Sequence, residues 1–277
     1  YNGLPKAQSS DLTITYTFGG SDFPNSSVTY TYSGPAYSNS NIPPSIAGTY
    51  QVIASVNFSI TGLVNSIPFA FTIDKATPTL SVTNPTLTYT ANTQSATLSS
   101  SVAGLITNVK YNGSSTLPIN AGTYTITADF APTDASNYNS LTGEVAGNFT
   151  INKAPVTISN IVLTKVYDGT PTVNVISNSS SGTISSDNVA IQGSATNFSD
   201  KIVANNYSST VTFNLVTIPS TGKEDNYIFV GGNQRSISNG SITAKPITVT
   251  PTAGQSKVYG SANPVFGYSL SEVVSVT

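Results

Sequence analysis

The sequence predicts an all-β protein built from tandem β-sandwich modules in an elongated array. Three observations support this prediction: short runs in which apolar and polar residues alternate, dense Gly and Pro punctuation between the runs, and a joint motif that recurs. Alternation with a period of two is the pattern of a half-buried strand. Because 21 Gly and 16 Pro are spread among 277 residues, no window remains for a long amphipathic helix. We therefore expect no α-helix of more than about two turns.

The joint motif is Phe149-Thr150-Ile151-Asn152-Lys153-Ala154-Pro155. Nearly the same sequence occurs at Phe71-Thr72-Ile73-Asp74-Lys75-Ala76, and a looser copy occurs at Ser241-Ile242-Thr243-Ala244-Lys245-Pro246. In each copy an alternating run ends at a Lys, and a new Thr/Val/Ile-rich run follows. The lysines are 78 (153 − 75) and 92 (245 − 153) residues apart, a period that suits sandwich domains of about 100 residues.

These joints divide the chain into four modules. We expect β-sandwich modules of one type at 1–73 and 74–152, a β module of another subtype at 153–245, and the truncated start of a further module at 246–277. The chain opens within a motif at Tyr1, so we interpret it as a fragment of a longer exported protein. Almost no spare residues lie at the joint before Pro155, which stiffens the backbone, and we expect a string of modules with limited bending.

The elements follow from the alternation in chain order. In the first module, Leu12–Phe18 alternates and meets a turn at Gly19-Gly20, and further strands are expected at 28–32, 47–60 and 69–73. In the second, Ala121–Ala128 is the counterpart of Ala47–Ala54, and Tyr111-Asn112-Gly113 matches Tyr32-Ser33-Gly34, where the alternating run stops. In the third module, strands are expected at 156–159, 209–215 and 227–230.

Composition excludes several classes of function. Charged residues make up 8% of the chain and the net charge is −2; without a Lys/Arg cluster, a nucleic-acid surface is disfavoured. Cys and His are absent, which removes most metal sites and nucleophilic triads. We therefore expect no enzyme, no cofactor and no catalytic or metal residues. No apolar run reaches the roughly 18 residues that a membrane span needs.

Short motifs carry a family resemblance. The first two modules resemble bacterial Ig-like MBG repeats through Ala47-Gly48-Thr49-Tyr50, Ala121-Gly122-Thr123-Tyr124 and the terminal Thr-Ile-x-Lys-Ala. The third resembles the YDG repeat through Tyr167-Asp168-Gly169, and Ser256–Pro264 resembles the start of another MBG module.

This resemblance implies a structural spacer in the stalk of a large secreted adhesin of Bacteroidetes-type bacteria. Such a stalk lies at the cell surface, presents distal binding domains for adhesion or gliding motility, and contacts mainly its neighbouring modules. The resemblance transfers no catalytic residues.

A glycan- or protein-binding β-sandwich is the alternative. The chain has 15 Tyr but no Trp, and three or more coplanar, exposed Tyr rings would favour this function. An enzyme ranks third, because no carboxylate pair or nucleophile–base pair stands out.

Two acidic loops are candidate sites. Asp129 and Asp134, with Asn137 and Asn139, could gather oxygen ligands for Ca²⁺, although Asx turns explain the same residues. Tyr167-Asp168-Gly169 is interpreted as a tight turn in which Gly has positive φ, Asp hydrogen-bonds the turn and Tyr packs.

Three surface features have structural alternatives. Lys75 and Lys153 could form Lys–Asn isopeptide crosslinks, but module ends are expected to be exposed. Thr13-Ile14-Thr15 and Thr123-Tyr124-Thr125 could form a flat ice- or glycan-facing surface, or simply the solvent face of strands. The sequon Asn148-Phe149-Thr150 carries little weight in a bacterial protein.

The Tyr of each Ala-Gly-Thr-Tyr stretch predicts a tyrosine corner, in which its hydroxyl bonds back to the backbone. Ile126 and Val52, two residues after Tyr124 and Tyr50, then lie on the same strand face and are expected in the core. Gly122 and Gly48 are expected to adopt αL turns.

Overall fold

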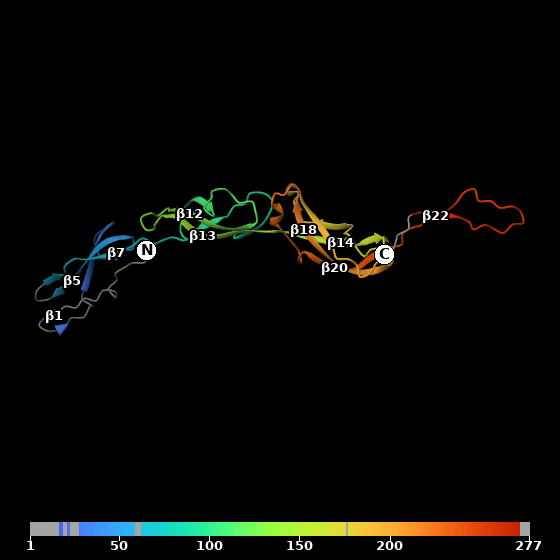
Figure 1. Ribbon diagram of the computed structural model, residues 1–277. Coiled ribbons are helices and arrows are strands. Elements are labelled where there is room, and N and C mark those ends of the chain that lie inside the picture. Colours follow the sequence, from blue (N-terminus) through green and yellow to red (C-terminus); the bar gives the residue numbers. More distant parts are fainter. Residues whose placement is uncertain (1–16, 19–20, 23–27, 59–61, 176, 272–277) are drawn as a thin grey trace. The chain divides into compact units, whose positions relative to one another are not determined.

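The computed structural model describes residues 17–18, 21–22, 28–58, 62–175 and 177–271 (Figure 1). Across these ranges the regular structure consists of strands and two short 3₁₀ turns, η2 (Ser185–Asp187) and η3 (Lys223–Asn226). The all-β class is therefore confirmed. Of the strand expected at 12–18, only β1 (Thr17–Phe18) is described, paired with β2 (Ser21–Asp22). Gly19-Gly20 and Thr13-Ile14-Thr15 lie outside the described residues.

The chain forms two compact units. Unit 1 comprises residues 1–86, 94–118 and 123–150, and unit 2 comprises residues 87–93, 119–122 and 151–277. These limits cut across the four expected modules, whose boundaries stay a prediction.

A five-stranded sheet forms the first part of unit 1. Its strands are β3 (Val28–Gly34), β4 (Tyr37–Ser40), β5 (Gly48–Phe58), β6 (Gly62–Asn65) and β7 (Phe69–Ile73), in the order β4-β3-β5-β6 with β7 also paired to β5. The strands expected at 28–32 and 69–73 are present, and β5 matches the strand expected at 47–60 as far as Phe58, with residues 59–60 outside the described ranges. Alternate residues of β5, beginning with Tyr50, Val52 and Ala54, are buried, as the period of two requires.

Two further sheets follow. One pairs β8 (Leu80–Val82) with β10 (Leu98–Ser100), and the other has the order β11-β12-β13-β9, formed by β9 (Thr86–Thr88), β11 (Gly104–Tyr111), β12 (Gly122–Pro132) and β13 (Leu141–Asn152). In β12 the core side chains Ile126, Ala128 and Phe130 alternate with outward residues, and Thr125 is exposed. The expected register of β12 is therefore confirmed.

A tight turn follows Tyr111. Tyr111 and Ser114 exchange backbone hydrogen bonds of 2.7 and 3.0 Å, and Asn112 and Gly113 between them both have positive φ, 47° and 84°. An Asn-Gly pair favours this two-residue hairpin turn.

In unit 2, side chains of two sheets form a buried cluster. The first sheet has the order β16-β14-β19, with β14 (Ala154–Val162), β16 (Ser177–Ser181) and β19 (Tyr227–Phe229). The second has the order β15-β20-β18-β17, with β15 (Thr164–Val166), β17 (Val189–Ala195), β18 (Ala204–Thr217) and β20 (Gln234–Thr243). The chain passes from one sheet to the other at buried Leu163. The strands expected at 156–159 and 209–215 fall within β14 and β18, and the strand expected at 227–230 matches β19, which ends one residue earlier at Phe229.

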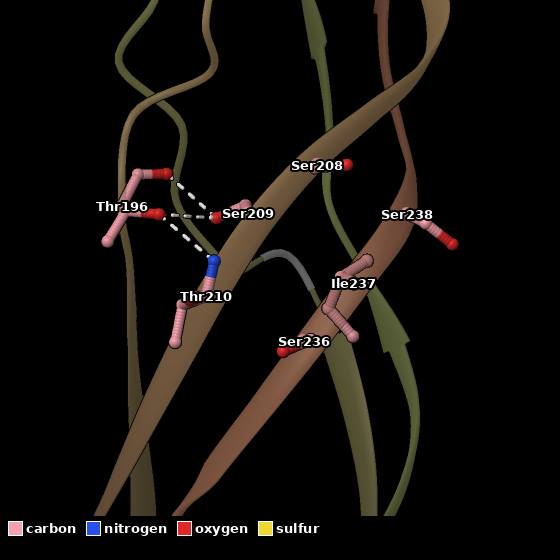
Figure 2. Close-up of a pocket in the computed structure, with 7 residues that line it drawn as sticks. All are labelled: Thr196, Ser208, Ser209, Thr210, Ser236, Ile237 and Ser238. Atoms are coloured by element: carbon pink, nitrogen blue, oxygen red, sulfur yellow. Dashed lines mark hydrogen bonds between the residues drawn. The ribbon is translucent and has the colours of Figure 1, made fainter.

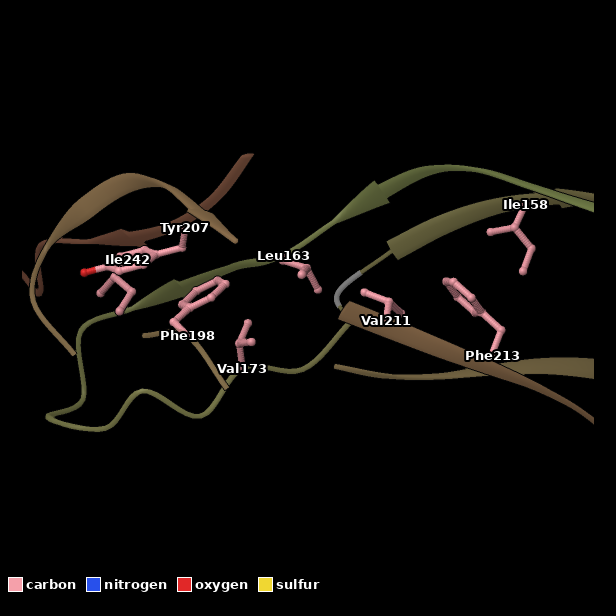
Figure 3. Close-up of a cluster of buried hydrophobic side chains, with 8 residues drawn as sticks. All are labelled: Ile158, Leu163, Val173, Phe198, Tyr207, Val211, Phe213 and Ile242. Carbon is pink, nitrogen blue, oxygen red and sulfur yellow. The ribbon is translucent and has the colours of Figure 1, made fainter. Parts of the chain in front are cut away.

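Side chains from both sheets meet in this core. Figure 3 shows the rings of Phe198 and Tyr207 side by side, stacked with their centroids 4.8 Å apart. The cluster consists of Ile158, Leu163, Val173, Phe198, Tyr207, Val211, Phe213 and Ile242. Two pairings, β14 with β19 and β15 with β20, are parallel, whereas an Ig domain is described by antiparallel sheets. The tandem Ig-like arrangement therefore stays a prediction.

The last described element is the ribbon of β21 (Val249–Pro251) and β22 (Tyr268–Leu270). Thr248 N donates to Ser271 Oγ at 2.9 Å, and Ser271 N donates to Thr248 O at 2.8 Å. Thr79 and Ser101 make the same two bonds beside β8 and β10, at 2.9 and 3.0 Å. The ribbon thus reproduces the local pairing of β8 and β10.

The joint at Lys153 has the expected length. Lys153 alone separates β13 from β14, which confirms a joint with almost no spare residues.

The αL turns expected at Gly48 and Gly122, where β5 and β12 begin, are wrong. Gly122 is not among the residues with positive φ, and the φ of Gly48, 157°, is close to extended. A Cβ on Gly48 would lie 3.0 Å from Pro35 Cγ, and its φ remains positive, so close packing and backbone conformation both disfavour a side chain there.

Among the described residues, no helix has the length and apolar character needed to cross a membrane.

Candidate functional site

The carboxylates proposed for Ca²⁺ are held separately by the chain's own donors. Asp129 accepts from Gly143 N at 2.7 Å and from Asn108 Nδ2 at 3.0 Å. These two hydrogen bonds lower the pKa of Asp129.

Asp134 forms the turn that Asx chemistry predicts. Hydrogen bonds from Ser136 and Asn137 lower the pKa of Asp134, and Asn137 contributes both its side-chain Nδ2, at 2.7 Å, and its backbone N, at 3.2 Å. Asn139 Nδ2 lies 3.2 Å from Thr77 Oγ1. Within the described ranges, no group of three or more acidic side chains is placed to hold a metal ion.

Tyr167-Asp168-Gly169 is a turn organised around a lysine. Gly169 has a φ of 82°, and Tyr167 packs on the unit 2 core. Asp168 Oδ1 accepts from Lys165 Nζ at 2.6 Å and from Thr170 N at 2.9 Å. The hydrogen bond from Lys165, followed by those from Thr170, lowers the pKa of Asp168 to about 2. The structural interpretation of this motif is confirmed.

The joint lysines and the Thr runs lie at the surface. Lys75 and Lys153 are both exposed, as expected for module ends, and Lys75 Nζ donates to Ala135 O at 2.7 Å. An isopeptide needs a buried Lys beside an acid, so neither residue fits that chemistry. Exposed Thr123 and Thr125 contact Thr150 and Asn148 of β13 across the strands, with Asn148 of the sequon itself exposed.

The tyrosine corner is present at Tyr50, whose hydroxyl donates to Ile46 O at 2.9 Å. A second, unexpected corner is made by Tyr207, whose hydroxyl donates to Ile202 O at 2.8 Å. Tyr124 is partly buried. Val52 and Ile126 are 2% and 0% exposed, so both core positions are confirmed.

In unit 1, a buried Asn holds the start of β5. Asn137 is 5% exposed, and its Oδ1 accepts from Ala47 N at 2.8 Å. Its backbone O accepts from Ala76 N at 2.9 Å, and the next residue, Tyr138, forms a parallel bridge with Ala76. Asn137 thus ties the Lys75-Ala76 joint to the Ala-Gly-Thr-Tyr stretch.

Unit 2 contains the same contact. Asn226 is 3% exposed, and its Oδ1 accepts from Ala121 N at 2.7 Å. The next residue, Tyr227, pairs in parallel with Ala154, which follows Lys153. We call each of these hydrogen bonds, Asn137 to Ala47 and Asn226 to Ala121, an Asn clasp.

A buried carboxylate lies beside the second clasp. Asp187 has a fully buried side chain that accepts from Tyr227 Oη at 2.6 Å, Tyr89 Oη at 2.7 Å and Lys223 Nζ at 2.9 Å. Burial alone would raise the pKa of Asp187, but these three donors outweigh it and hold the pKa below its ordinary value. Three hydrogen-bond donors therefore stabilise the buried negative charge of Asp187.

The pKa values of Tyr89 and Tyr227, which both donate to Asp187, shift in the opposite direction. Burial, and then the hydrogen bond to Asp187, raises the pKa of Tyr227 to about 12 and also raises the pKa of Tyr89. Their rings pack edge to face, with centroids 5.5 Å apart. All three groups keep a fixed protonation state near neutral pH, which suits a structural cluster better than a proton-transfer site.

An open hollow of about 390 Å³ lies on the β18–β20 surface (Figure 2). Ser209 Oγ donates to Thr196 O at 2.8 Å, and Thr196 Oγ1 accepts from Thr210 N at 3.0 Å. The lining residues are Thr196, Ser208, Ser209, Thr210, Ser236, Ile237 and Ser238. The lining carries hydroxyls but no charged or aromatic side chain, so it offers hydrogen bonds without a nucleophile–base pair.

Aromatic side chains are mostly taken up by the fold. Of the Tyr residues whose burial is described, only Tyr259 and Tyr268 are exposed. This number falls short of the three coplanar rings that would favour a sugar platform.

Comparison with known proteins assigns two domain types. Residues 76–155 match the MBG domain family, and residues 151–236 match the YDG domain family. Within residues 76–236 the chain is therefore similar to an MBG domain followed by a YDG domain. Asn137 of the first clasp lies in the stretch that matches the MBG family, and Asp187 lies in the stretch that matches the YDG family. The MBG character of residues 1–73 and 246–277 stays a prediction.

No curated protein matches the chain. Among solved structures it is similar to a Bacteroides ovatus mixed-linkage glucan utilization locus protein, SGBP-B, in complex with a mixed-linkage heptasaccharide. The identity is 14%, the TM-score is 0.18, and the match covers 85% of this chain and 64% of that one. A likeness of this extent carries no argument about fold or ligand.

Sequence reasoning missed the two buried Asn residues and Asp187. A usable signal was present: an Asn-Tyr pair begins 62 (137 − 75) residues after Lys75 and 73 (226 − 153) residues after Lys153. Asp187 stands in no motif, and only the fold brings it to Tyr89.

Proposed function

We propose that the chain is a run of structural spacer repeats from the stalk of a large bacterial cell-surface adhesin. It lies outside the cell and presents distal binding domains for adhesion or surface motility. The observation that carries the proposal is the joint at Lys153, the single residue between the two long strands β13 and β14. A joint without slack passes tension directly from one repeat to the next.

The use of the acidic side chains also supports a structural role. Asp134 and Asp168 each accept hydrogen bonds within their own turns. Asp129, in β12, accepts from Asn108 of β11 and Gly143 of β13, and Asp187 is buried among three donors. Glu224 accepts from Thr217 Oγ1. These carboxylates are used by the chain's own donors, which leaves little unpaired chemistry for a substrate.

Stretching single molecules of the whole chain between two handles tests this function. We expect separate unfolding steps whose contour lengths correspond to the repeats, together with no saturable binding on a glycan array. A radius of gyration near the ~19 Å of a compact domain of this length would contradict the spacer role, as would a single unfolding step at low force.

A glycan- or protein-binding β module is the second candidate, and the hydroxyl-lined hollow favours it. Sugar hydroxyls could pair with Ser236 and Ser238, which are exposed on β20. Binding on the array that is lost in the double variant Ser236→Ala, Ser238→Ala would support this function. Binding that persists in the variant would place the ligand elsewhere, and no binding would favour the spacer.

A further inference from the structure

The two Asn clasps have the same chemistry in different compact units. Ala47 opens one Ala-Gly-Thr-Tyr stretch and Ala121 opens the other. Each Ala donates its backbone N–H to the Oδ1 of a buried Asn, at 2.8 and 2.7 Å. The partners are 90 and 105 residues apart in sequence, so local chain geometry does not account for either bond.

Each Asn is positioned by its own repeat. Tyr138 bridges in parallel to Ala76, and Tyr227 pairs in parallel with Ala154. These pairings fix the Asn backbone against the first strand of its repeat. The side chain then extends to an Ala that belongs, by sequence, to the preceding repeat.

Burial makes the acceptor necessary. Asn137 and Asn226 are 5% and 3% exposed, so water has little access to the bond. An amide N–H that is buried without an acceptor is unfavourable. A repeat without this Asn would leave the preceding Ala N–H unpaired, and the contact therefore selects its partner.

We propose that the Ala-Gly-Thr-Tyr edge of an MBG repeat is a docking site for the next repeat of the same chain. The anchor is the buried Asn that precedes the Tyr of that next repeat. The partner can be of either subtype, because Asn137 lies in the MBG domain and Asn226 in the YDG domain. This role deepens the proposed spacer function and rests on it, since docked repeats resist bending under load.

Amide hydrogen exchange of the whole chain, followed residue by residue by NMR, tests the docking site. In Asn226→Leu, which removes the acceptor at similar volume, we expect the Ala121 amide to exchange at least about tenfold faster while the Ala47 amide is unchanged. Asn137→Leu should give the reverse result. Each variant is thus the matched control for the other.

Two outcomes would overturn the proposal: unchanged exchange at Ala121 in Asn226→Leu, or equal acceleration of both amides in either variant. If a variant fails to fold, the wild-type chain decides the matter. A through-hydrogen-bond coupling between Ala121 N and Asn226 Cγ supports the clasp, and its absence contradicts it. Glycan binding would overturn the spacer role without changing these exchange rates, so the two failures are distinguishable.

Discussion

At the scale of single residues, cohesion comes from packing, because the chain has no Cys. Ile126 is 0% exposed, and its neighbour Thr125 points to solvent. Comparing substitutions at these two positions is the most direct check on the register of β12.

Ile126→Ala should lower the free energy of unfolding by about 2–5 kcal/mol, because it removes buried methyl groups and leaves a cavity. Thr125→Ala, on the opposite face, should cost less than about 1 kcal/mol. Denaturant unfolding of both variants measures the difference. Equal losses would show that the register of β12 is wrong.

Asp187 should make stability depend on pH at the acidic end. Its pKa in the folded state is lowered, so the folded chain binds fewer protons here than the unfolded chain, whose Asp titrates near ~3.9. The stability that Asp187 contributes is present above that value and is lost as the pH falls through the lowered pKa.

The variant Asp187→Asn cannot titrate at this position. We expect it to be less stable than the wild type at pH values near neutral, with a difference that narrows on acidification below about pH 4. Urea midpoints across this pH range measure the effect. A difference that stays constant would mean that the carboxylate charge contributes nothing to stability.

Sequence patterns predicted those features that depend on residues close together in the chain. Alternation located Ile126 and Val52, and Tyr50 predicted its own corner. The Asp187 cluster could not be predicted, since Tyr89 and Asp187 are 98 residues apart and only the folded sheets bring them together.

At the scale of elements, β18 and β20 meet closely where Tyr207 pairs with Gly240. A Cβ on Gly240 would lie 2.5 Å from Phe198 Cε1 and 3.0 Å from the backbone O of Tyr207. Glycine here makes room for the Phe198–Tyr207 stack rather than for an unusual backbone angle.

Gly240→Ala should therefore destabilise unit 2 by about 1–3 kcal/mol through overpacking. Ser238→Ala, at an exposed position on the same strand, is the control and should change stability by no more than about 0.5 kcal/mol. Thermal unfolding of both variants compares them. A neutral Gly240→Ala would mean that the ring moves aside without cost.

The joints show the limit of element prediction. The sequence located Lys75 and Lys153 and the strands on either side, because these features are local. It attributed Asn137 to a possible Ca²⁺ loop, since no local pattern reveals that its partner is Ala47. The αL prediction for Gly122 was also wrong, because a Gly before a strand was interpreted as a turn residue.

At the scale of the whole molecule, electrostatics should matter little. The chain has 10 basic and 12 acidic residues, and interactions between exposed charges are weakened by screening. We expect the melting temperature to change little between low and high sodium chloride. A large increase on adding Ca²⁺ would instead indicate a metal site at Asp129 and Asp134, contrary to their hydrogen bonding.

The pairing of an Asn in one repeat with an Ala in the preceding repeat has a consequence for how the gene gains or loses repeats. Residues 74–152 hold both Asn137, which reaches back, and Ala121, which receives the Asn that follows. A duplication or deletion in phase with the Lys-Ala joint would recreate a complete pair at each new boundary without any compensating substitution. Unequal recombination would therefore lengthen or shorten the protein one repeat at a time. A breakpoint between Ala121 and Asn137 would instead leave one residue of a clasp without its hydrogen-bond partner.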